Sequence, residues 1–471
     1  MSTERASGVI MGCICPHPPV MIPEVGKSDA SKTRASINGM RELAEAIKAC
    51  SPDCLIFITP HGNVFADAIS FLVEPVLEGN LAGFGAGDVR FAADNDLELL
   101  RAWAVACEAA ALPLVAIDKD TPYQGVSPKL DHGVMVPLYF LEQAGIKALP
   151  FIVISQAGLP EDELYQAGMC LQQACQETGR RVVIVASGDM SHRLADDSPY
   201  GFNPAGPEFD QLISTIIKEA DISELLRVPP ELRDSAGECG YRSLVMMAGA
   251  FDEQELTSWI YSYQKPFGIG YLVAALAPTG KNQASVYNEF INNYQQKMDT
   301  SRREESAPVA WARQVLESYI NRHVLPDAPQ ISDPLFSQQA GVFVSLKKKG
   351  QLRGCIGTIF PTTSNIEEEI KNNAVSSGTR DPRFPAVHPQ ELTDLVYSVD
   401  ILGKPEPCRR EDLDPAVYGV IVRHGSKTGL LLPALEGVDT VDEQLRIALS
   451  KAGIKASEDY QIERFMVERY H

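Results

Sequence analysis

The sequence of 471 residues predicts an α/β protein with a second, smaller α+β domain. Short apolar segments alternate with segments of helical periodicity through the first 280 residues, which is the pattern of a sheet covered by helices. After residue 306, strand-like and helical segments follow one another without regular alternation, which favours an α+β arrangement. A chain of this length also exceeds one ordinary hydrophobic core, so more than one domain is expected.

The clearest element of the first region is residues 181–193, with the sequence RVVIVASGDMSHR. Residues 182–186 are mostly β-branched and predict a strand that is buried on both faces. A polar loop with Asp189, Ser191 and His192 follows it. Further strands are expected over residues 9–15, 54–59, 113–117, 149–154, 256–263 and 269–277, and helices over residues 33–50, 95–111, 134–141, 160–178, 207–220 and 243–250.

The second region is predicted from turn and capping signals. Residues 341–346 and 351–359 predict a hairpin around a lysine-rich turn, and Thr440 and Gly453 stand where a helix would begin and end. Other helices are expected over residues 310–323 and 365–376, and strands over residues 395–402, 419–423 and 428–432. The polar segment TSRREES separates the regions, so we expect a first domain at residues 1–279, a linker at 280–306 and a second domain at 307–471.

Composition limits the classes of function. The formal net charge of −20 argues against general binding to nucleic acids or anionic membranes, which requires basic patches. No apolar run reaches the length of a membrane span, and the N-terminus lacks the pattern of a signal peptide. The ten cysteines include no CxxC pair, so most thiols are expected to be core residues. These features predict a cytoplasmic protein with reduced thiols.

Four of the eight histidines follow strand-like segments or turns of the first region: His17, His61, His132 and His192. Ligands of α/β sheets bind at the carboxyl ends of the strands, where such residues would gather. Glu238, between glycines, adds a carboxylate. Two histidines and a carboxylate can hold iron(II), and the other histidines can transfer protons. The same side chains also suit a zinc hydrolase, or ordinary loop positions without a ligand.

Five motifs occur in order in the first region: CPHPP at 15–19, TPHGN at 59–63, LDHGVMVPL at 130–138, SGDMSHR at 187–193 and AGECGYRSL at 236–244. Through these motifs, residues 8–277 resemble the class III extradiol dioxygenases, the LigB-like family to which the Memo proteins are distantly related. This resemblance implies a mixed-sheet α/β domain that cleaves a catecholic substrate with iron(II) and dioxygen. Relatives of this family often pair their subunits, which makes a homodimer an expectation here.

The resemblance also implies roles for particular residues. His17 and His61 match the histidine ligands of the metal, and Glu238 matches the carboxylate ligand. Memo-type relatives place a cysteine near this third position, and Cys239 adjoins Glu238. A hard carboxylate suits iron(II) better than a thiolate does, so we favour Glu238 and keep Cys239 as the alternative.

The other two histidines match the groups that handle protons in the reaction. His192 corresponds to the catalytic acid/base, and His132 to a second proton-handling residue. The leading hypothesis is therefore an iron(II)-dependent extradiol-type dioxygenase. One alternative is an iron-binding oxidising component of a system that modifies a partner macromolecule, and another is a metal-binding scaffold without catalysis.

Residues 308–471 resemble the AMMECR family, through LRGCIGTI at 352–359, NNAVSSGTRDPRFPAV at 372–387 and LVYSVDIL at 395–402. This likeness implies a fold without a known reaction. Arg353 and Cys355 lie in a glycine-containing segment that could form a nucleophile loop, or a tight turn with a buried cysteine. Arg380, Asp381 and Arg383 could form an anion-binding loop, or a salt-bridged surface loop.

The combination of these two families in one chain is similar to the AmmeMemoRadiSam system. In that system an AMMECR protein and a Memo-like protein are associated with a radical-SAM protein. The resemblance therefore implies a separate radical-SAM protein as a partner, since this chain has no CxxxCxxC cluster motif.

Overall fold

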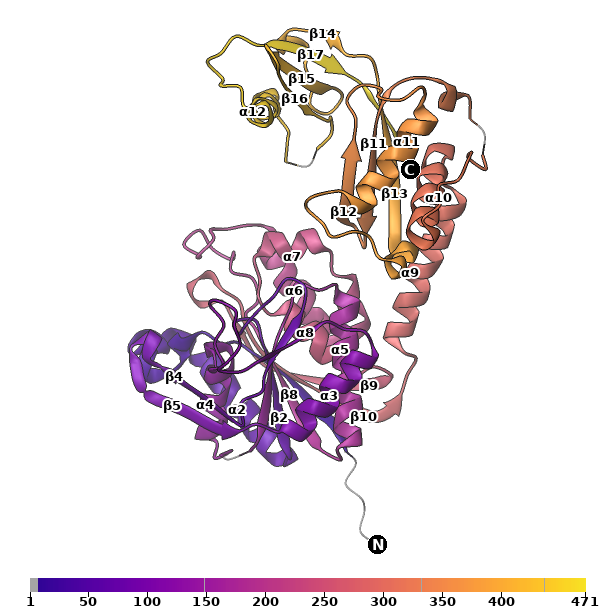
Figure 1. The fold of residues 1–471 in the computed structure, drawn as a ribbon. Helices are drawn as coiled ribbons and strands as arrows, with labels where there is room; N and C mark the ends of the chain where they lie inside the picture. The colour runs from indigo at the N-terminus through magenta and orange to yellow at the C-terminus, as the bar shows by residue number, and fades with distance from the viewer. Residues whose placement is uncertain (1–6, 148, 332, 436) are drawn as a thin grey trace. The chain divides into compact units, whose positions relative to one another are not determined.

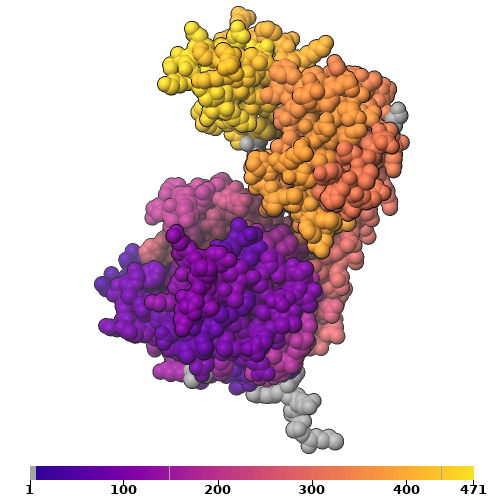
Figure 2. Space-filling model, viewed as in Figure 1, coloured from indigo at the N-terminus to yellow at the C-terminus, as the bar shows by residue number. Residues whose placement is uncertain are grey.

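The computed structural model describes residues 7–147, 149–331, 333–435 and 437–471 (Figure 1). The chain divides into two compact units, Met1–Asn292 and Asn293–His471. Figure 2 shows the atoms of both units, the first coloured from indigo to magenta and the second ending in yellow. Helix α9 (Val286–Arg303) spans the division between them. It occupies most of the segment that the sequence analysis assigned to a linker.

The first unit is built on a mixed sheet of eight strands in the order β6-β3-β7-β2-β8-β1-β10-β9. Strands β7, β2, β8 and β1 run parallel to one another, whereas β10 and β9 add antiparallel strands at one edge. The strands are β1 (Gly8–Cys15), β2 (Cys54–Thr59), β3 (Ile69–Leu72), β6 (Leu114–Ile117), β7 (Phe151–Ser155), β8 (Arg181–Ser187), β9 (Gln254–Gln264) and β10 (Tyr271–Asn282).

Helices cover both faces of this sheet because its central strands are apolar on both sides. Leu55 and Phe57 of β2 belong to the core beneath α2 and α4, whereas Ile56 and Ile58 belong to the core beneath α3, α5 and α8. The helices are α1 (Pro23–Gly26), α2 (Arg34–Cys50), α3 (Leu97–Ala109), α4 (His132–Gln143), α5 (Glu161–Glu177), α6 (Ala205–Glu219), α7 (Pro230–Ala236) and α8 (Tyr241–Gly249).

The second unit contains two antiparallel four-stranded sheets, in the orders β12-β11-β13-β18 and β14-β17-β15-β16. Helices α10 and α11 pack on the first sheet, and α12 packs on the second. The elements are α10 (Ala307–Arg322), β11 (Gly341–Lys348), β12 (Gln351–Gly357), α11 (Ile366–Thr379), β13 (Leu395–Leu402), β14 (Glu406–Pro407), β15 (Gly419–His424), β16 (Lys427–Leu431), α12 (Val441–Ala452), β17 (Gln461–Phe465) and β18 (Val467–Tyr470).

The predicted fold class is confirmed in both units, with a mixed sheet in the first and an α+β arrangement in the second. The structure adds strands that the sequence analysis did not predict. Among them, β4 (Val76–Leu81) and β5 (Ala86–Asp94) form a separate two-stranded sheet. Their glycines and acidic residues have low strand propensity, and the alternating burial of β4 arises only from tertiary packing. No helix within the described residues is long and apolar enough to span a membrane.

Candidate metal centre

Three neighbouring parallel strands bring polar side chains to one edge of the first sheet. The register pairs Cys15 with Ser187, and Ile58 with Ala186, so β1, β2 and β8 end at the same level. His17, His61 and Asp189 each lie two residues beyond the end of one of these strands. Because the three chains leave the sheet together, residues far apart in the sequence become neighbours.

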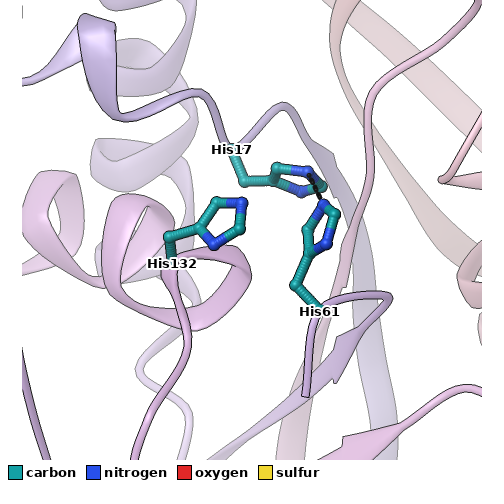
Figure 3. A group of neighbouring side chains, drawn as sticks. All are labelled: His17, His61 and His132. Carbon is teal, nitrogen blue, oxygen red and sulfur yellow. Dashed lines mark hydrogen bonds between the residues drawn. The ribbon is translucent and has the colours of Figure 1, made fainter. Parts of the chain in front are cut away.

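The histidines form a tight group (Figure 3). The Nε2 atoms of His17 and His61 are 2.9 Å apart, while the Nδ1 atom of His17 lies 2.9 Å from Ser187 Oγ. His132 is the first residue of α4, where the Asp131 side chain accepts a hydrogen bond from Gly133 N. Its ring stacks on that of His61, with centroids 4.3 Å apart. Ser187 and the start of α4 thus orient imidazoles toward one point.

Burial favours the neutral form of these imidazoles. Desolvation lowers the pKa of His17 well below its ordinary value, and the neighbouring histidines lower it further. Desolvation lowers the pKa of His61 as well, and it lowers the pKa values of His132 and His192 to about 4. Neutral imidazole is the form that binds metal ions. The group is therefore ready to accept a cation near neutral pH.

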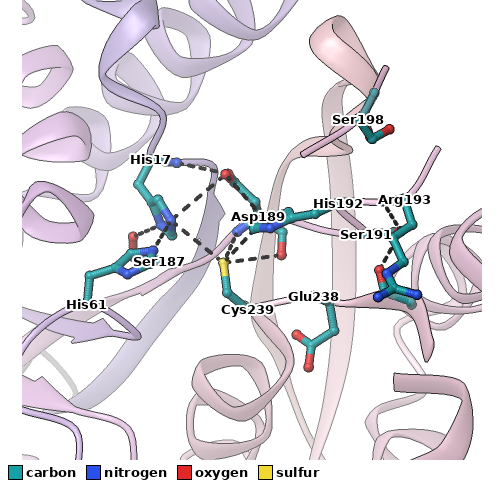
Figure 4. Close-up of polar contacts among 12 residues, drawn as sticks. His17, His61, Ser187, Asp189, Ser191, His192, Arg193, Ser198, Glu238 and Cys239 are labelled. Carbon is teal, nitrogen blue, oxygen red and sulfur yellow. Dashed lines mark hydrogen bonds and ion pairs between the residues drawn. The ribbon is translucent and has the colours of Figure 1, made fainter. Parts of the chain in front are cut away.

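Asp189 and Cys239 complete the group (Figure 4). Asp189 is buried and accepts a hydrogen bond from His17 N at 3.2 Å, while its Oδ2 lies 3.9 Å from His17 Nε2. Burial raises its pKa to about 8. The Sγ atom of Cys239 lies 3.7 Å from His17 Nε2 and accepts a hydrogen bond from Asp189 N. Two sets of donors thus share His17: one with His61 and His132, the other with Asp189 and Cys239.

A close backbone contact allows Cys239 to reach this place. A Cβ atom on Gly188 would lie 2.0 Å from the Cα of Gly240. The two backbone segments can therefore lie this close only because both residues are glycines. Gly240 N donates to the carbonyl oxygen of Asp189 across this contact. The segment before α8 is therefore fixed against the end of β8, with the thiol directed at the histidines.

Glu238 is not among the side chains that the structure gathers here, and its expected role as the carboxylate ligand stays a prediction. Its carboxylate accepts a hydrogen bond from Tyr241 N at 2.6 Å, at the start of α8, and it points away from the histidines (Figure 4). Unsatisfied N–H groups at a helix N-terminus attract carboxylates, which explains this orientation. The buried carboxylate near the histidines is that of Asp189, in a loop whose acidic residue the sequence analysis noted without assigning a role.

His192 lies beside the group rather than within it. Its Nε2 atom is 3.9 Å from both Cys239 Sγ and Asp189 Oδ2, and its side chain is 17% exposed. The exposed ring of Tyr200 stacks on it, with centroids 5.9 Å apart. This position is compatible with the predicted exchange of protons between the centre and its surroundings.

The residues singled out in the second unit separate into two places. Asp381 accepts hydrogen bonds from Cys355 N and from the Arg383 side chain, so these three residues are neighbours. Arg353 instead forms two hydrogen bonds with the carboxylate of Glu391. The structure thus brings together three of these four residues.

The fold and the donor set define an α/β protein with a candidate metal centre at the carboxyl edge of its sheet. The chain belongs to the LigB family: residues 12–274 match the model of the catalytic LigB subunit of aromatic ring-opening dioxygenase. Residues 309–471 match the AMMECR1 model, so the second unit is an AMMECR1 domain. Both resemblances noted in the sequence are confirmed.

Similar proteins cover either nearly the whole chain or about a third of it. Protein CA_C1420 of Clostridium acetobutylicum is 40% identical over 460 residues, covering 97% of this chain and 98% of its own length. A Thermotoga maritima protein is 53% identical over 167 residues, which is 34% of this chain and 95% of that protein. The crystal structure of PH0010 from Pyrococcus horikoshii, described as uncharacterized, covers 34% of this chain and 88% of its own, with 30% identity and a TM-score of 0.33.

Proposed function

We propose that this protein is a metal-dependent oxygenase of the extradiol type, which opens a catecholic ring with iron(II) and dioxygen. The observation that carries the proposal is the position of His17 Nε2, which lies 2.9 Å from His61 Nε2 and 3.9 Å from the buried carboxylate of Asp189. Two histidines and one carboxylate are the donor set of non-haem iron(II) oxygenases. Membership in the LigB family supports the same reaction class.

The residues present fit a divalent cation. The imidazoles are held neutral, and Asp189 is a buried carboxylate whose raised pKa reflects too few partners for its charge. A cation would supply the missing partner, so we assign His17, His61 and Asp189 as its ligands. When bound there, iron(II) would align a catecholic substrate with dioxygen and pass electron density between them.

The surrounding side chains handle protons and orientation. His192, neutral and partly exposed, accepts the proton of the substrate hydroxyl at Nε2. His132 stacks on His61 and so fixes the ring of a ligand, while its own neutral nitrogen can exchange a proton with the reacting group. Ser187 holds His17 through Nδ1, which leaves Nε2 directed at the centre.

The test compares two carboxylates that adjoin the same site. We would purify the full chain without oxygen, load it with iron(II), and measure bound iron and dioxygen consumption with a panel of catechols. Asp189→Asn should lose iron and activity, whereas Glu238→Gln should keep both, because its side chain points to Tyr241 N. His192→Ala should keep iron and lose turnover. Equal iron in the wild type and Asp189→Asn, or no dioxygen consumption with any catechol, would overturn the proposal.

The thiol of Cys239 favours a second candidate, a metal–thiolate centre that holds a softer metal and does not activate dioxygen. Its Sγ lies 3.7 Å from His17 Nε2, and thiolates select zinc or copper(I) over iron(II). Zinc or copper bound to the purified chain, with loss of that metal in Cys239→Ser and none in Asp189→Asn, would establish this alternative.

A further inference from the structure

A second cluster of reactive and charged groups lies in the AMMECR1 domain, around Cys355. In β11, Val342 and Leu346 are buried beneath helices α10 and α11, so Ser345 points to the opposite face of the sheet. Cys355 is its direct partner on the edge strand β12. The cysteine is partly exposed on this face, on the side of the sheet away from the helices.

The thiol of Cys355 is held in one position. Ser345 Oγ donates a hydrogen bond to its Sγ at 3.2 Å. Its backbone N donates to Asp381 Oδ2 at 2.8 Å. The neighbouring Gly354 passes so close to α11 that a Cβ atom would lie 2.2 Å from the carbonyl oxygen of Ser377. The strand is thereby fixed, and the sulfur with it.

One guanidinium group lies beside Cys355, and a second lies on the same face of the sheet. Arg383 is held by Asp381, through its Nε and Nη2 atoms, and also donates to the carbonyl oxygen of Cys355 at 3.2 Å. Arg469 is held by Asp400 in the same way, at 2.7 and 2.9 Å. The side chains of Arg383 and Arg469 are 54% and 38% exposed. Arg469 pairs with Asp400, and Asp400 pairs with Phe343 of β11, so Arg469 lies on the face of the sheet that carries Ser345 and Cys355.

Both arginines keep hydrogen-bonding capacity for a ligand. The paired carboxylates occupy Nε and Nη2, and the Nη1 groups donate to no acceptor in the described part of the chain. A guanidinium fixed by a carboxylate loses little entropy when it binds an anion. Arg353 has less hydrogen-bonding capacity left, because it donates hydrogen bonds to the Glu391 carboxylate and to the carbonyl oxygen of Pro385.

We propose that Cys355, Arg383 and Arg469 form a thiol site for a small anionic electrophile, a molecule whose carboxylate or phosphate lies next to an electrophilic carbon. The arginines bind the anionic group and place the carbon near the sulfur. The sulfur forms a bond to that carbon, the leaving group departs with the electron pair of its own bond, and the thiol proton passes to water. This inference is independent of the metal centre in the first unit.

The experiment compares two alkylating reagents that differ in charge. The full-length protein is treated with iodoacetate or iodoacetamide, and the rate at each cysteine is followed by peptide mass spectrometry. Cys408, also partly exposed in the same unit, is the internal reference. We expect the iodoacetate-to-iodoacetamide rate ratio at Cys355 to exceed that at Cys408. It should fall about two- to fivefold in Arg383→Gln and in Arg469→Gln, the size expected for one partly exposed charge.

Two further variants separate this role from general effects. Arg380→Gln removes an exposed guanidinium from the same loop and leaves the hydrogen bonds of Cys355 to Ser345, Asp381 and Arg383 in place, so the ratio should stay unchanged. Ser345→Ala should slow both reagents by the same factor, because it removes the hydrogen bond to sulfur without changing the charge. Equal ratios at Cys355 and Cys408, or a ratio at Cys355 that neither Arg383→Gln nor Arg469→Gln lowers, would overturn the proposal.

Discussion

Two carboxylates, Asp189 in the LigB domain and Asp381 in the AMMECR1 domain, are equally buried, each at 4% exposure. Their surroundings differ. The Asp189 side chain accepts one hydrogen bond, from His17 N, whereas Asp381 accepts bonds from Cys355 N and from three N–H groups of Arg383. Burial raises the pKa of Asp189 to about 8, while the hydrogen bonds from Arg383 hold the pKa of Asp381 below its usual range.

The comparison shows that burial alone does not define the role of an acidic residue. A carboxylate whose hydrogen bonds are satisfied carries its charge within the fold and stabilises it. A carboxylate buried with few donors is costly unless a cation or a proton joins it. Asp381 therefore fixes a loop, and Asp189 belongs to the candidate metal centre.

The largest expected effect is the difference in stability between the Asp381 and Asp189 variants, measured on the metal-free chain. Asp381→Ala should destabilise the AMMECR1 domain by about 3 kcal/mol, because Cys355 N and Arg383 lose their acceptor. Asp189→Ala should leave the stability of the LigB domain unchanged or raise it, since a desolvated carboxylate is lost. Hydrogen exchange measured by mass spectrometry would resolve the two units. A larger loss for Asp189→Ala than for Asp381→Ala would reverse the comparison.

Metal addition should stabilise only one of the two units. At a free iron(II) concentration about 100 times Kd, binding to the native state contributes about 2.7 kcal/mol. Slower hydrogen exchange is expected at the ends of β1, β2 and β8, and no change is expected at β11 and β12. The Asp189→Asn chain under the same conditions is the control. Equal protection of both units would contradict a single centre in the LigB domain.

The pH dependence of stability should differ in sign between two acidic groups. Burial raises the pKa of Asp210 to about 6, above its unfolded value, so the folded state binds its proton more tightly. The associated stability, about 3 kcal/mol, is present below pH 4 and is lost as pH rises through 6. For Asp381, the pKa is lowered, so its contribution is present above pH 4 and is lost as pH falls.

Urea unfolding between pH 3 and pH 7 would measure how the stability of each unit changes with pH. Hydrogen exchange would follow the two units separately and show whether their slopes have opposite signs. Asp210→Asn should flatten the dependence between pH 4 and 6 in the LigB domain only, and Asp381→Asn should flatten the acid limb in the AMMECR1 domain only. Unchanged profiles in both variants would show that other groups determine the pH dependence.

The smallest expected effect concerns a local feature that needs no tertiary contact. Thr440 caps α12 by accepting a hydrogen bond from Glu443 N at 3.2 Å. Thr440→Ala should cost about 1 kcal/mol, and Thr440→Ser should cost little, because serine offers the same acceptor. Urea midpoints of the two variants would measure the difference. Equal losses in both would assign the effect to packing of the Thr440 methyl group.

Much of the fold could be predicted because its elements carry local signals. The β-branched run before Ser187 predicts a buried strand, and Thr440 with Gly453 marks both ends of α12. The same signals placed His17 and His61 just beyond strand ends. Strands β4 and β5 were not predicted, because their sequences have weak strand propensity and their pairing is stabilised by burial against α4.

What the sequence alone determined is most of the long helices and strands, the two families, and the histidines at the strand ends. Tertiary structure decided which acidic residue meets them. Glu238 and Cys239 are adjacent, and no local pattern states which of the two faces the centre. The free N–H of Tyr241 takes the carboxylate, and the contact of Gly188 with Gly240 turns the thiol to the histidines. The orientation of each side chain depends on contacts between segments that are distant in the sequence. These contacts determine which backbone groups are available as hydrogen-bond partners.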